Sequence, residues 1–112
     1  MKKPDILRNQ KDFNRLYNKG KSSGSKYAVL IVLKNGLDFN RKAFVASKKT
    51  GNSVKRHRAV RLLREGYREL ENTFPKGYDI LLIARPNIGE AKCADVKKSI
   101  EAAKKRVFGE NK

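Results

Sequence analysis

Four basic side chains recur at one-turn intervals along a segment with the pattern of an amphipathic helix. On a helical wheel of residues 53–72, one stripe contains His57, Arg61, Arg64 and Arg68. Successive members lie about one helical turn, or roughly 5 Å, apart, which is comparable to the phosphate spacing along a nucleic-acid strand. Guanidinium groups bind phosphate oxygens through paired hydrogen bonds and are always charged. The stripe therefore predicts a phosphate-binding surface.

Neighbouring residues extend this surface, and two alternatives accompany it. The predicted RNA-binding residues are Lys48, Lys49, Asn52, Lys55, Arg56, His57, Arg58, Arg61, Arg64 and Arg68. The alternative for the stripe is a solvated face paired with acids, for which Glu65, Glu69 and Glu71 are nearby. At the helix start, the unpaired N–H groups favour a bound phosphate. A plain strand-to-helix connection capped by Ser53 explains the same residues.

The charge balance of the chain also favours nucleic acid as the partner. The 112 residues include 28 Lys and Arg against 11 Asp and Glu, a formal net charge of +17. Residues 41–68 hold ten basic and one acidic residue, so this quarter of the chain has about half of the excess, 10 − 1 = +9. Such an excess opposes compaction by self-repulsion, and binding to a phosphate backbone explains why it is kept. Membrane-surface binding normally uses a basic amphipathic helix with Trp, Phe or Leu opposite, and the chain has no Trp.

Hydrophobic periodicity predicts one domain, residues 1–112, with helices packed on a small mixed sheet in the order α-β-β-α-β-α, an α+β fold. The expected elements are a helix at 9–19, a Gly/Ser loop at 21–26, a buried strand at 27–33, a hairpin turn region at 34–41, a returning strand at 42–48, the long helix at 53–72, a turn at 73–78, a buried strand at 79–84, a loop at 85–89 and a helix at 90–107. The packing face of the long helix should consist of Ala59, Val60, Leu63, Gly66, Tyr67 and Leu70.

Cysteine and apolar content set expectations about the cellular compartment. Cys93 is the single cysteine, so no intrachain disulfide can form, and we expect a half-buried helix residue rather than a metal ligand or nucleophile. The basic N-terminus is not followed by an apolar stretch, and the longest apolar run, residues 27–33, is too short to span a bilayer. We therefore expect a soluble, cytoplasmic protein that does not bind membranes.

Residues suited to general acid–base or metal chemistry are too scattered to predict a catalytic site in the polypeptide. The only histidine, His57, lies in the arginine-rich segment, where an RNA contact is the simpler role. The carboxylates Asp12, Asp38, Asp79 and Asp95 belong to different expected elements and share no motif. No catalytic and no metal-binding residue is therefore assigned.

Residues 48–65, KKTGNSVKRHRAVRLLRE, resemble the signature of the bacterial ribonuclease P protein component, roughly K-K-x-G-x-A-V-x-R-N-R-x-K-R-x-x-R. The segments K-D-F-x-x-x-Y-x-x-G at 11–20 and D-I-L-L-I-A-R at 79–85 also fit, so the resemblance covers nearly the whole chain. Two positions depart from the pattern: His57 stands where the family usually has Asn, and Val60 where it usually has Lys.

The resemblance implies a subunit of a ribonucleoprotein endonuclease. The protein would bind the ribonuclease P RNA, a large catalytic RNA, and the two together would remove the 5′ leader of precursor tRNA. The RNA would perform the hydrolysis with Mg²⁺ bound mainly by its own phosphates. The resemblance also implies a left-handed β-α-β crossover around the arginine-rich helix, whereas general topology rules favour a right-handed one.

The resemblance further implies a cleft between the sheet and the first helix that holds the leader as a single strand. The residues expected at this cleft are Phe13, Tyr17, Lys11 and Arg15, and core packing is the alternative for the two aromatic rings. Ile31 stands where relatives often have an aromatic residue. Single strands are commonly bound by stacking in a basic groove.

Three other functions remain open from the residues alone. A structural RNA-binding module, such as a ribosomal protein, would be equally basic. A small autonomous nuclease would cleave RNA without an RNA subunit. A DNA-binding helix is the third and weaker alternative: no paired helices with a short turn precede the arginine-rich segment, so a helix-turn-helix is not supported, and no DNA partner is expected.

Overall fold

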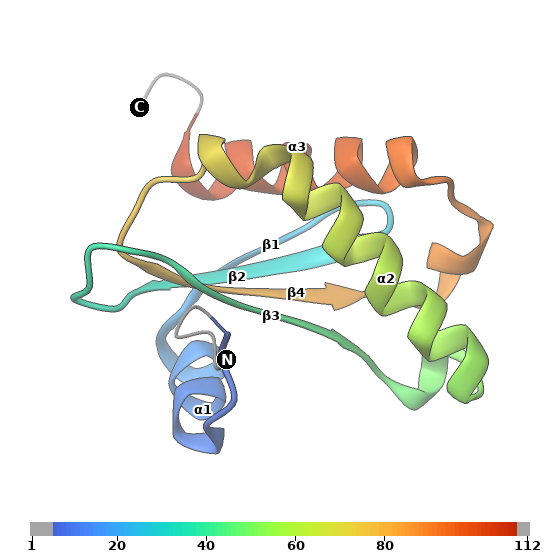
Figure 1. The fold of residues 1–112 in the computed structure, drawn as a ribbon, viewed down its shortest axis with the longest axis horizontal. Helices are drawn as coiled ribbons and strands as arrows, with labels where there is room; N and C mark the ends of the chain where they lie inside the picture. Colours follow the sequence, from blue (N-terminus) through green and yellow to red (C-terminus); the bar gives the residue numbers. More distant parts are fainter. Residues whose placement is uncertain (1–5, 110–112) are drawn as a thin grey trace.

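The computed structural model describes residues 6–109, so residues 1–5 and 110–112 of the predicted domain lie outside the described part. In chain order its elements are α1 (Gln10–Lys19), β1 (Lys21–Gly24), β2 (Ala28–Lys34), β3 (Arg41–Ala46), the 3-10 turn η1 (Lys48–Thr50), α2 (Ser53–Leu70), the turn η2 (Glu71–Thr73), β4 (Tyr78–Ala84), the turn η3 (Pro86–Glu90) and α3 (Cys93–Phe108). Figure 1 shows α2 and α3 on one face of a single sheet and α1 on the other. The predicted α+β class is confirmed.

The sheet contains one more strand than the sequence predicts. Residues 21–26, expected to form a loop, begin with β1, which pairs antiparallel with β2. The turn between them is closed by a hydrogen bond from the Ser25 amide to the Ala28 carbonyl, 2.8 Å long. The Lys-Ser-Ser-Gly segment has no alternating apolar pattern, so periodicity does not reveal it as a strand. This edge strand is held by main-chain hydrogen bonds to β2 rather than by side-chain burial.

The predicted hairpin between residues 27–33 and 42–48 is wrong. The strand order is β1-β2-β4-β3, so β4 lies between β2 and β3; it is antiparallel to β2 and parallel to β3. The turn signal itself is real: Gly36 has a φ of 77°, and the Asn35 side chain accepts a hydrogen bond from the Leu37 amide. The loop then continues to Asn40 and carries the chain past the start of β4. A turn signal alone does not report which strands pair.

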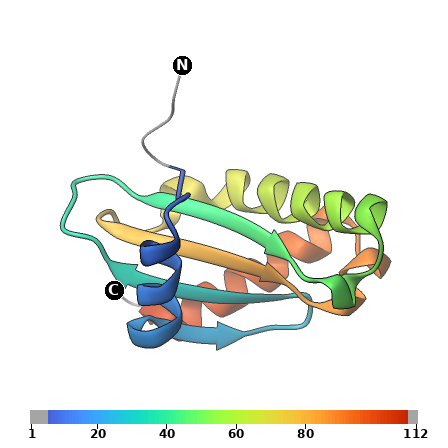
Figure 2. The same ribbon diagram turned by 90° about the horizontal axis from the view of Figure 1, so that it is seen from below.

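The connection from β3 through α2 to β4 is left-handed. Figure 2 views the sheet from the α1 side, with β3 and β4 both running left to right, β3 above β4 and α2 behind the sheet. This is the rarer hand for two parallel strands joined by a helix, and it agrees with the family resemblance.

The larger core lies between the sheet and the pair α2 and α3. The predicted packing face of α2 is buried at Ala59, Leu63, Gly66, Tyr67 and Leu70. Val60, assigned to that face, is only half-buried, and Leu62 is buried in addition. Because α3 crosses close to α2, a Cβ at position 66 would lie 3.3 Å from the backbone nitrogen of Lys97, so glycine permits the approach.

The ends of the long helices differ from the sequence-based bounds by a few residues. α2 ends at Leu70 and continues as the tighter turn η2, and α3 begins at Cys93 rather than Glu90. The start of α3 is set by Asp95, whose carboxylate accepts a hydrogen bond from the Lys92 amide at 3.1 Å. Within residues 6–109, no helix combines the length and the apolar character needed to cross a bilayer.

Candidate nucleic-acid interface

The arginine-rich helix begins at a connection that is held by its own side chains. Asn52, not Ser53, caps α2, because its side chain accepts a hydrogen bond from the Lys55 amide at 3.0 Å. Gly51 precedes it with a φ of 136°, a conformation that favours glycine. The Ser53 cap expected from the sequence is therefore replaced by an Asn52 cap, which already uses one of the N–H groups considered for a phosphate.

Arg56 also serves this connection. Its guanidinium donates to the Gly51 carbonyl at 3.1 Å and to the Ser53 hydroxyl at 3.4 Å, and the residue is half-buried. Of the predicted RNA-binding residues, Asn52 and Arg56 thus have structural partners inside the chain. Lys48, Lys49 and Lys55 are exposed beside them.

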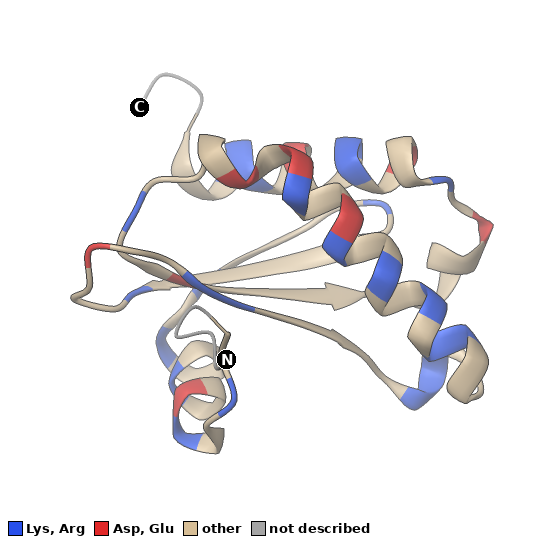
Figure 3. Ribbon diagram, viewed as in Figure 1, with Lys and Arg blue, Asp and Glu red and all other residues tan. Residues whose placement is uncertain are grey.

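The stripe predicted on α2 is present and open to solvent. His57, Arg58, Arg61, Arg64 and Arg68 are all exposed. The first four, which we call the arginine surface, line a hollow together with Val54 and Val60. Figure 3 shows basic residues following α2 from its N-terminal end. Val60, which departs from the family pattern, therefore contributes an apolar patch inside a basic surface.

Two of the three acids near the stripe have partners elsewhere, which weighs against the alternative of a self-paired solvated face. Glu71 forms an ion pair with Lys42 at 2.8 Å, and Glu69 forms one with Lys97 at 3.2 Å. Within residues 6–109, no carboxylate lies within ion-pair distance of Arg58 or Arg61. The guanidinium groups of Arg58 and Arg61 are therefore available to an external anion.

One member of the arginine surface also contacts the core. The Arg64 guanidinium lies 5.8 Å from the centre of the Phe44 ring, and Phe44 packs edge-on against Tyr67. This cation–π contact holds the Arg64 side chain over the sheet while its charge remains exposed.

The opposite face of the sheet is crossed by α1 and only partly covered by it. Strand register places three rows of side chains across β2, β4 and β3 on this face. The rows are Leu33–Asp79–Arg41, then Ile31–Leu81–Ala43, then Val29–Ile83–Val45. Leu16 of α1 is fully buried in the cluster formed by the middle row. The third row is half-buried, and Figure 2 shows the sheet uncovered towards the ends of β3 and β4.

The four residues predicted at a cleft beside α1 divide into two groups. Phe13 is half-buried in the same cluster as Leu16, which agrees with core packing. Tyr17 is 56% exposed, so its ring is available to a ligand. Lys11 and Arg15 are exposed, and Arg15 lies 3.4 Å from the Asp12 carboxylate. Asn9 caps the helix by accepting from the Lys11 amide at 2.9 Å, as its sequence position suggests.

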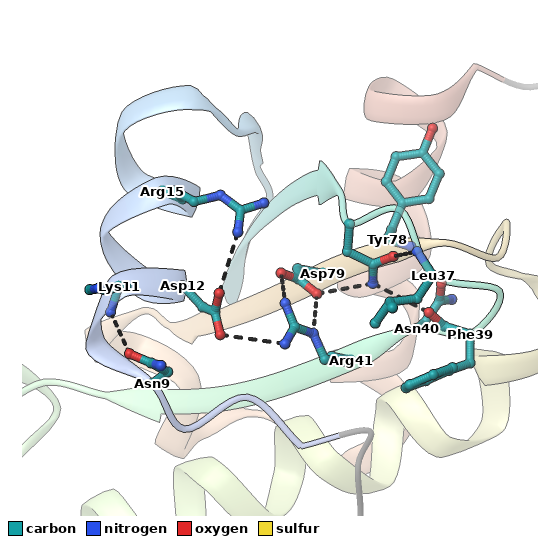
Figure 4. A network of polar contacts seen from close by, with 11 residues as sticks. Asn9, Lys11, Asp12, Arg15, Leu37, Phe39, Asn40, Arg41, Tyr78 and Asp79 are labelled. Carbon is teal, nitrogen blue, oxygen red and sulfur yellow. Dashed lines mark hydrogen bonds and ion pairs between the residues drawn. The ribbon is translucent and has the colours of Figure 1, made fainter.

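A network of polar side chains anchors α1 to the sheet, and little in the sequence points to it. Asp79, 1% exposed, accepts hydrogen bonds from Arg41 through both carboxylate oxygens, at 2.8 and 2.7 Å (Figure 4). Asn35 donates to the same carboxylate at 3.0 Å. The Arg41 guanidinium also lies 3.4 Å from Asp12 of α1. Hydrogen bonding to Asp79 raises the pKa of Arg41, so the guanidinium stays charged.

Sequence patterns do not single out Arg41, and they leave Asp12 and Asp79 as unrelated carboxylates. The available signal is a single acid at the start of the apolar strand DILLIA. A buried carboxylate needs a partner, but only the tertiary structure shows that the partner is Arg41.

Cys93 occupies the first position of α3 and is half-buried, as predicted. Burial and the nearby carboxylates of Glu65 and Glu69 raise the pKa of its thiol above the ordinary 9.0. We expect the pH midpoint of iodoacetamide alkylation to be higher for the folded protein than for the protein in urea. Because the unfolded thiol then ionises first, this residue's contribution to stability is present below about pH 9 and is lost as the pH rises through the folded value. Equal midpoints in the two states would contradict this assignment.

The side chains that the structure gathers around α2 and on the α1 face of the sheet are mainly basic and apolar. Within residues 6–109, no three His, Cys, Asp or Glu side chains lie together as a metal-ligand group would. The basic turn η1 begins two residues after β3 ends, close in the chain to Val45 of the half-buried row Val29–Ile83–Val45, and leads into α2 on the other face of the sheet. A charged surface and an apolar strip are thus joined by one strand.

Comparisons with known proteins agree with this arrangement. Residues 1–107 match the sequence profile of the family described as Ribonuclease P. The chain is 40% identical over 106 residues to the ribonuclease P protein component of Pelotomaculum thermopropionicum, covering 95% of each chain. It is 37% identical over 100 residues to that of Alkaliphilus metalliredigens, covering 89% of this chain and 90% of the relative.

Solved structures show the same similarity in three dimensions. The ribonuclease P protein of Thermotoga maritima superposes with a TM-score of 0.81 at 31% identity, covering 93% of this chain and 98% of that one. The Staphylococcus aureus protein superposes with a TM-score of 0.80 at 29% identity, covering 95% and 99%. The profile match, the sequence identities and the shared fold together show that this chain belongs to the ribonuclease P protein family.

Proposed function

We propose that this chain, as the protein component of ribonuclease P, binds the 5′ leader of precursor tRNA on the sheet face beside α1 while its arginine surface contacts the ribonuclease P RNA. Family membership establishes the RNA partner and the endoribonuclease holoenzyme. The observation behind the leader assignment is the half-buried row Val29–Ile83–Val45, which ends next to the basic residues of η1.

The sheet face has the properties that a single-stranded ligand needs. Bases can lie on an apolar strip and on the exposed ring of Tyr17, while Lys11, Arg15, Lys48 and Lys49 at its margins neutralise phosphates. Such contacts do not depend on base identity. A surface of this kind suits a leader whose sequence varies from one precursor tRNA to another.

The arginine surface has the properties that a folded RNA needs. Its members lie on a rigid helix, are exposed, and lack acidic partners in the part of the chain that the structure describes. Recognition of a structured RNA through its phosphates and shape requires this kind of preorganised positive surface. In this proposal Mg²⁺ is bound mainly by RNA phosphates and the hydrolysis belongs to the RNA subunit.

The test is cleavage of a precursor tRNA with a 5′ leader at low Mg²⁺ concentration. We would compare the protein alone, a bacterial ribonuclease P RNA alone, and the two combined. We expect efficient cleavage only in the mixture, and a smaller stimulation when the leader is shortened to a single nucleotide. Cleavage by the protein alone would show an autonomous nuclease. Stimulation that ignores the leader would contradict the leader assignment.

A further inference from the structure

We infer that Asp12, Arg41 and Asp79 form a positioning network that fixes α1 over the sheet and thereby sets the surface on which the leader binds. The inference rests on the proposed function and adds residues that do not themselves touch RNA. Figure 4 shows the three side chains lying in series, from α1 through β3 to β4.

The apolar attachment of α1 is small, so polar contacts matter for its placement. The helix has ten residues, and only Leu16 is fully buried, with Phe13 half-buried beside it. Burying one or two side chains restrains the distance between a helix and a sheet but not the helix direction. Leu7, just before the helix, is also buried in this cluster, and its amide donates a hydrogen bond to the Lys42 carbonyl at 2.8 Å, so the chain that enters α1 is held to β3. A second contact from the helix itself, away from Leu16, adds to this restraint on the helix direction.

Asp12 supplies that second contact, because it lies in the first turn of α1, one helical turn from Leu16. Its partner is held rigidly: Arg41 is bound at both carboxylate oxygens of Asp79, which is buried and also bonded to Asn35. The remaining guanidinium nitrogen of Arg41, Nη1, lies 3.4 Å from Asp12. The buried pair therefore presents one oriented positive group to the start of the helix.

The Asp12–Arg41–Asp79 network and the half-buried third row lie on opposite sides of the middle row, which α1 covers. Arg41 and Asp79 belong to the first row, Leu16 packs on the second, and the third row is Val29–Ile83–Val45. Without the Asp12 contact, the first turn of α1 would be restrained mainly through the preceding residue Leu7, and the helix could shift about Leu16. Its exposed side chains, Tyr17 among them, would then change position relative to the third row.

The charge of Asp12 argues against a direct role in binding. It is the only acid in α1, beside Lys11, Arg15 and Lys19. A carboxylate at the edge of an RNA-binding surface repels phosphates and opposes affinity. The contact between Asp12 and Arg41 explains, in structural terms, why a carboxylate is present at this position.

Loss of the Asp12 charge should favour RNA binding, whereas loss of its positioning contact should weaken leader binding, so one substitution distinguishes the two effects. In the holoenzyme reconstituted with ribonuclease P RNA, we would measure Kd for a precursor tRNA with a leader and for mature tRNA without one. Asp12→Asn removes one negative charge, so the change in net charge alone predicts equal or tighter binding of both RNAs. We expect instead that the preference for the leader-bearing RNA falls by roughly threefold or more, the range for losing a partly exposed ion pair.

Two control variants separate positioning from charge and from misfolding. Glu90→Gln makes the same charge change on an exposed side chain in η3 and should leave the preference unchanged. Asp12→Glu keeps the carboxylate and should retain most of the preference. Each variant is compared well below its melting temperature, and its affinity for the ribonuclease P RNA, a property of α2, should match that of the wild type.

The outcomes distinguish this inference from the proposed function. If the wild-type holoenzyme shows no preference for the leader, both fail. If it shows one and Asp12→Asn keeps it in full, the network does not position α1 for leader binding, although the leader assignment stands. If Asp12→Asn and Glu90→Gln lose the preference equally, net charge explains the effect and the inference is overturned.

Discussion

The Arg61→Ala/Arg64→Ala double variant is expected to bind ribonuclease P RNA at least about tenfold more weakly than the wild type at moderate salt. Each guanidinium that neutralises a phosphate releases condensed cations, so the slope of log affinity against log salt should flatten by about one unit per lost contact, about two in total. Filter binding or fluorescence anisotropy across a salt series measures both quantities. Both side chains are exposed, and Arg64 also lies over the Phe44 ring.

The stability of this double variant should change little. Arg61 has no carboxylate partner in the described part of the chain, and Arg64 loses only its contact with the Phe44 ring, worth about 0.5–1 kcal/mol at an exposed site. The matched control is Lys34→Ala/Lys76→Ala, which removes two exposed charges near the start of β4. An equal loss of salt dependence in the control would show that net charge, and not the arginine surface, determines binding.

The Asp79→Ala variant is expected to lower the free energy of unfolding by about 3 kcal/mol, the usual loss when one partner of a buried ion pair is removed. The substitution leaves the Arg41 guanidinium and the Asn35 amide without their shared carboxylate. Because Arg41 keeps some access to water and Asp12 as a neighbour, the loss should fall towards the lower end of the range for a fully enclosed charge. Urea unfolding followed by circular dichroism gives the value.

The control for this prediction is Asp38→Ala, in the loop between β2 and β3. Asp38 is an exposed carboxylate whose removal should change stability by less than about 0.5 kcal/mol. Asp79→Asn, which keeps one acceptor oxygen, should fall between the two. If Asp79→Ala unfolds at the same urea concentration as the wild type, the network does not stabilise the fold.

Much of the site could be predicted because its signals are local in sequence. The arginine surface follows from the spacing of His57, Arg61 and Arg64 on one helix, and helical periodicity does not depend on the rest of the chain. Runs of Val, Ile and Leu likewise mark β2 and β4 as buried strands. The order of residues 48–65 is distinctive enough to indicate the family by itself.

The errors concern contacts between segments distant in sequence. The chain between residues 34 and 41 contains a genuine turn, yet β4 lies between the strands it joins. β1 has no apolar alternation, because its contribution is a ladder of main-chain hydrogen bonds. The helical wheel assigns Val60 to the core, but α2 is rotated so that Leu62 is buried and Val60 faces the hollow.

The sequence by itself determined that the chain is basic, that its charge gathers on α2, and that helices must cover a sheet with apolar central strands. Only the tertiary structure decided that Arg41 meets Asp79 and Asp12, and that the row Val29–Ile83–Val45 stays partly uncovered beside α1. The physical reason is that periodicity reports which face of an element is apolar. It does not report which other element lies on that face, since that depends on strand order, register and the direction of each helix.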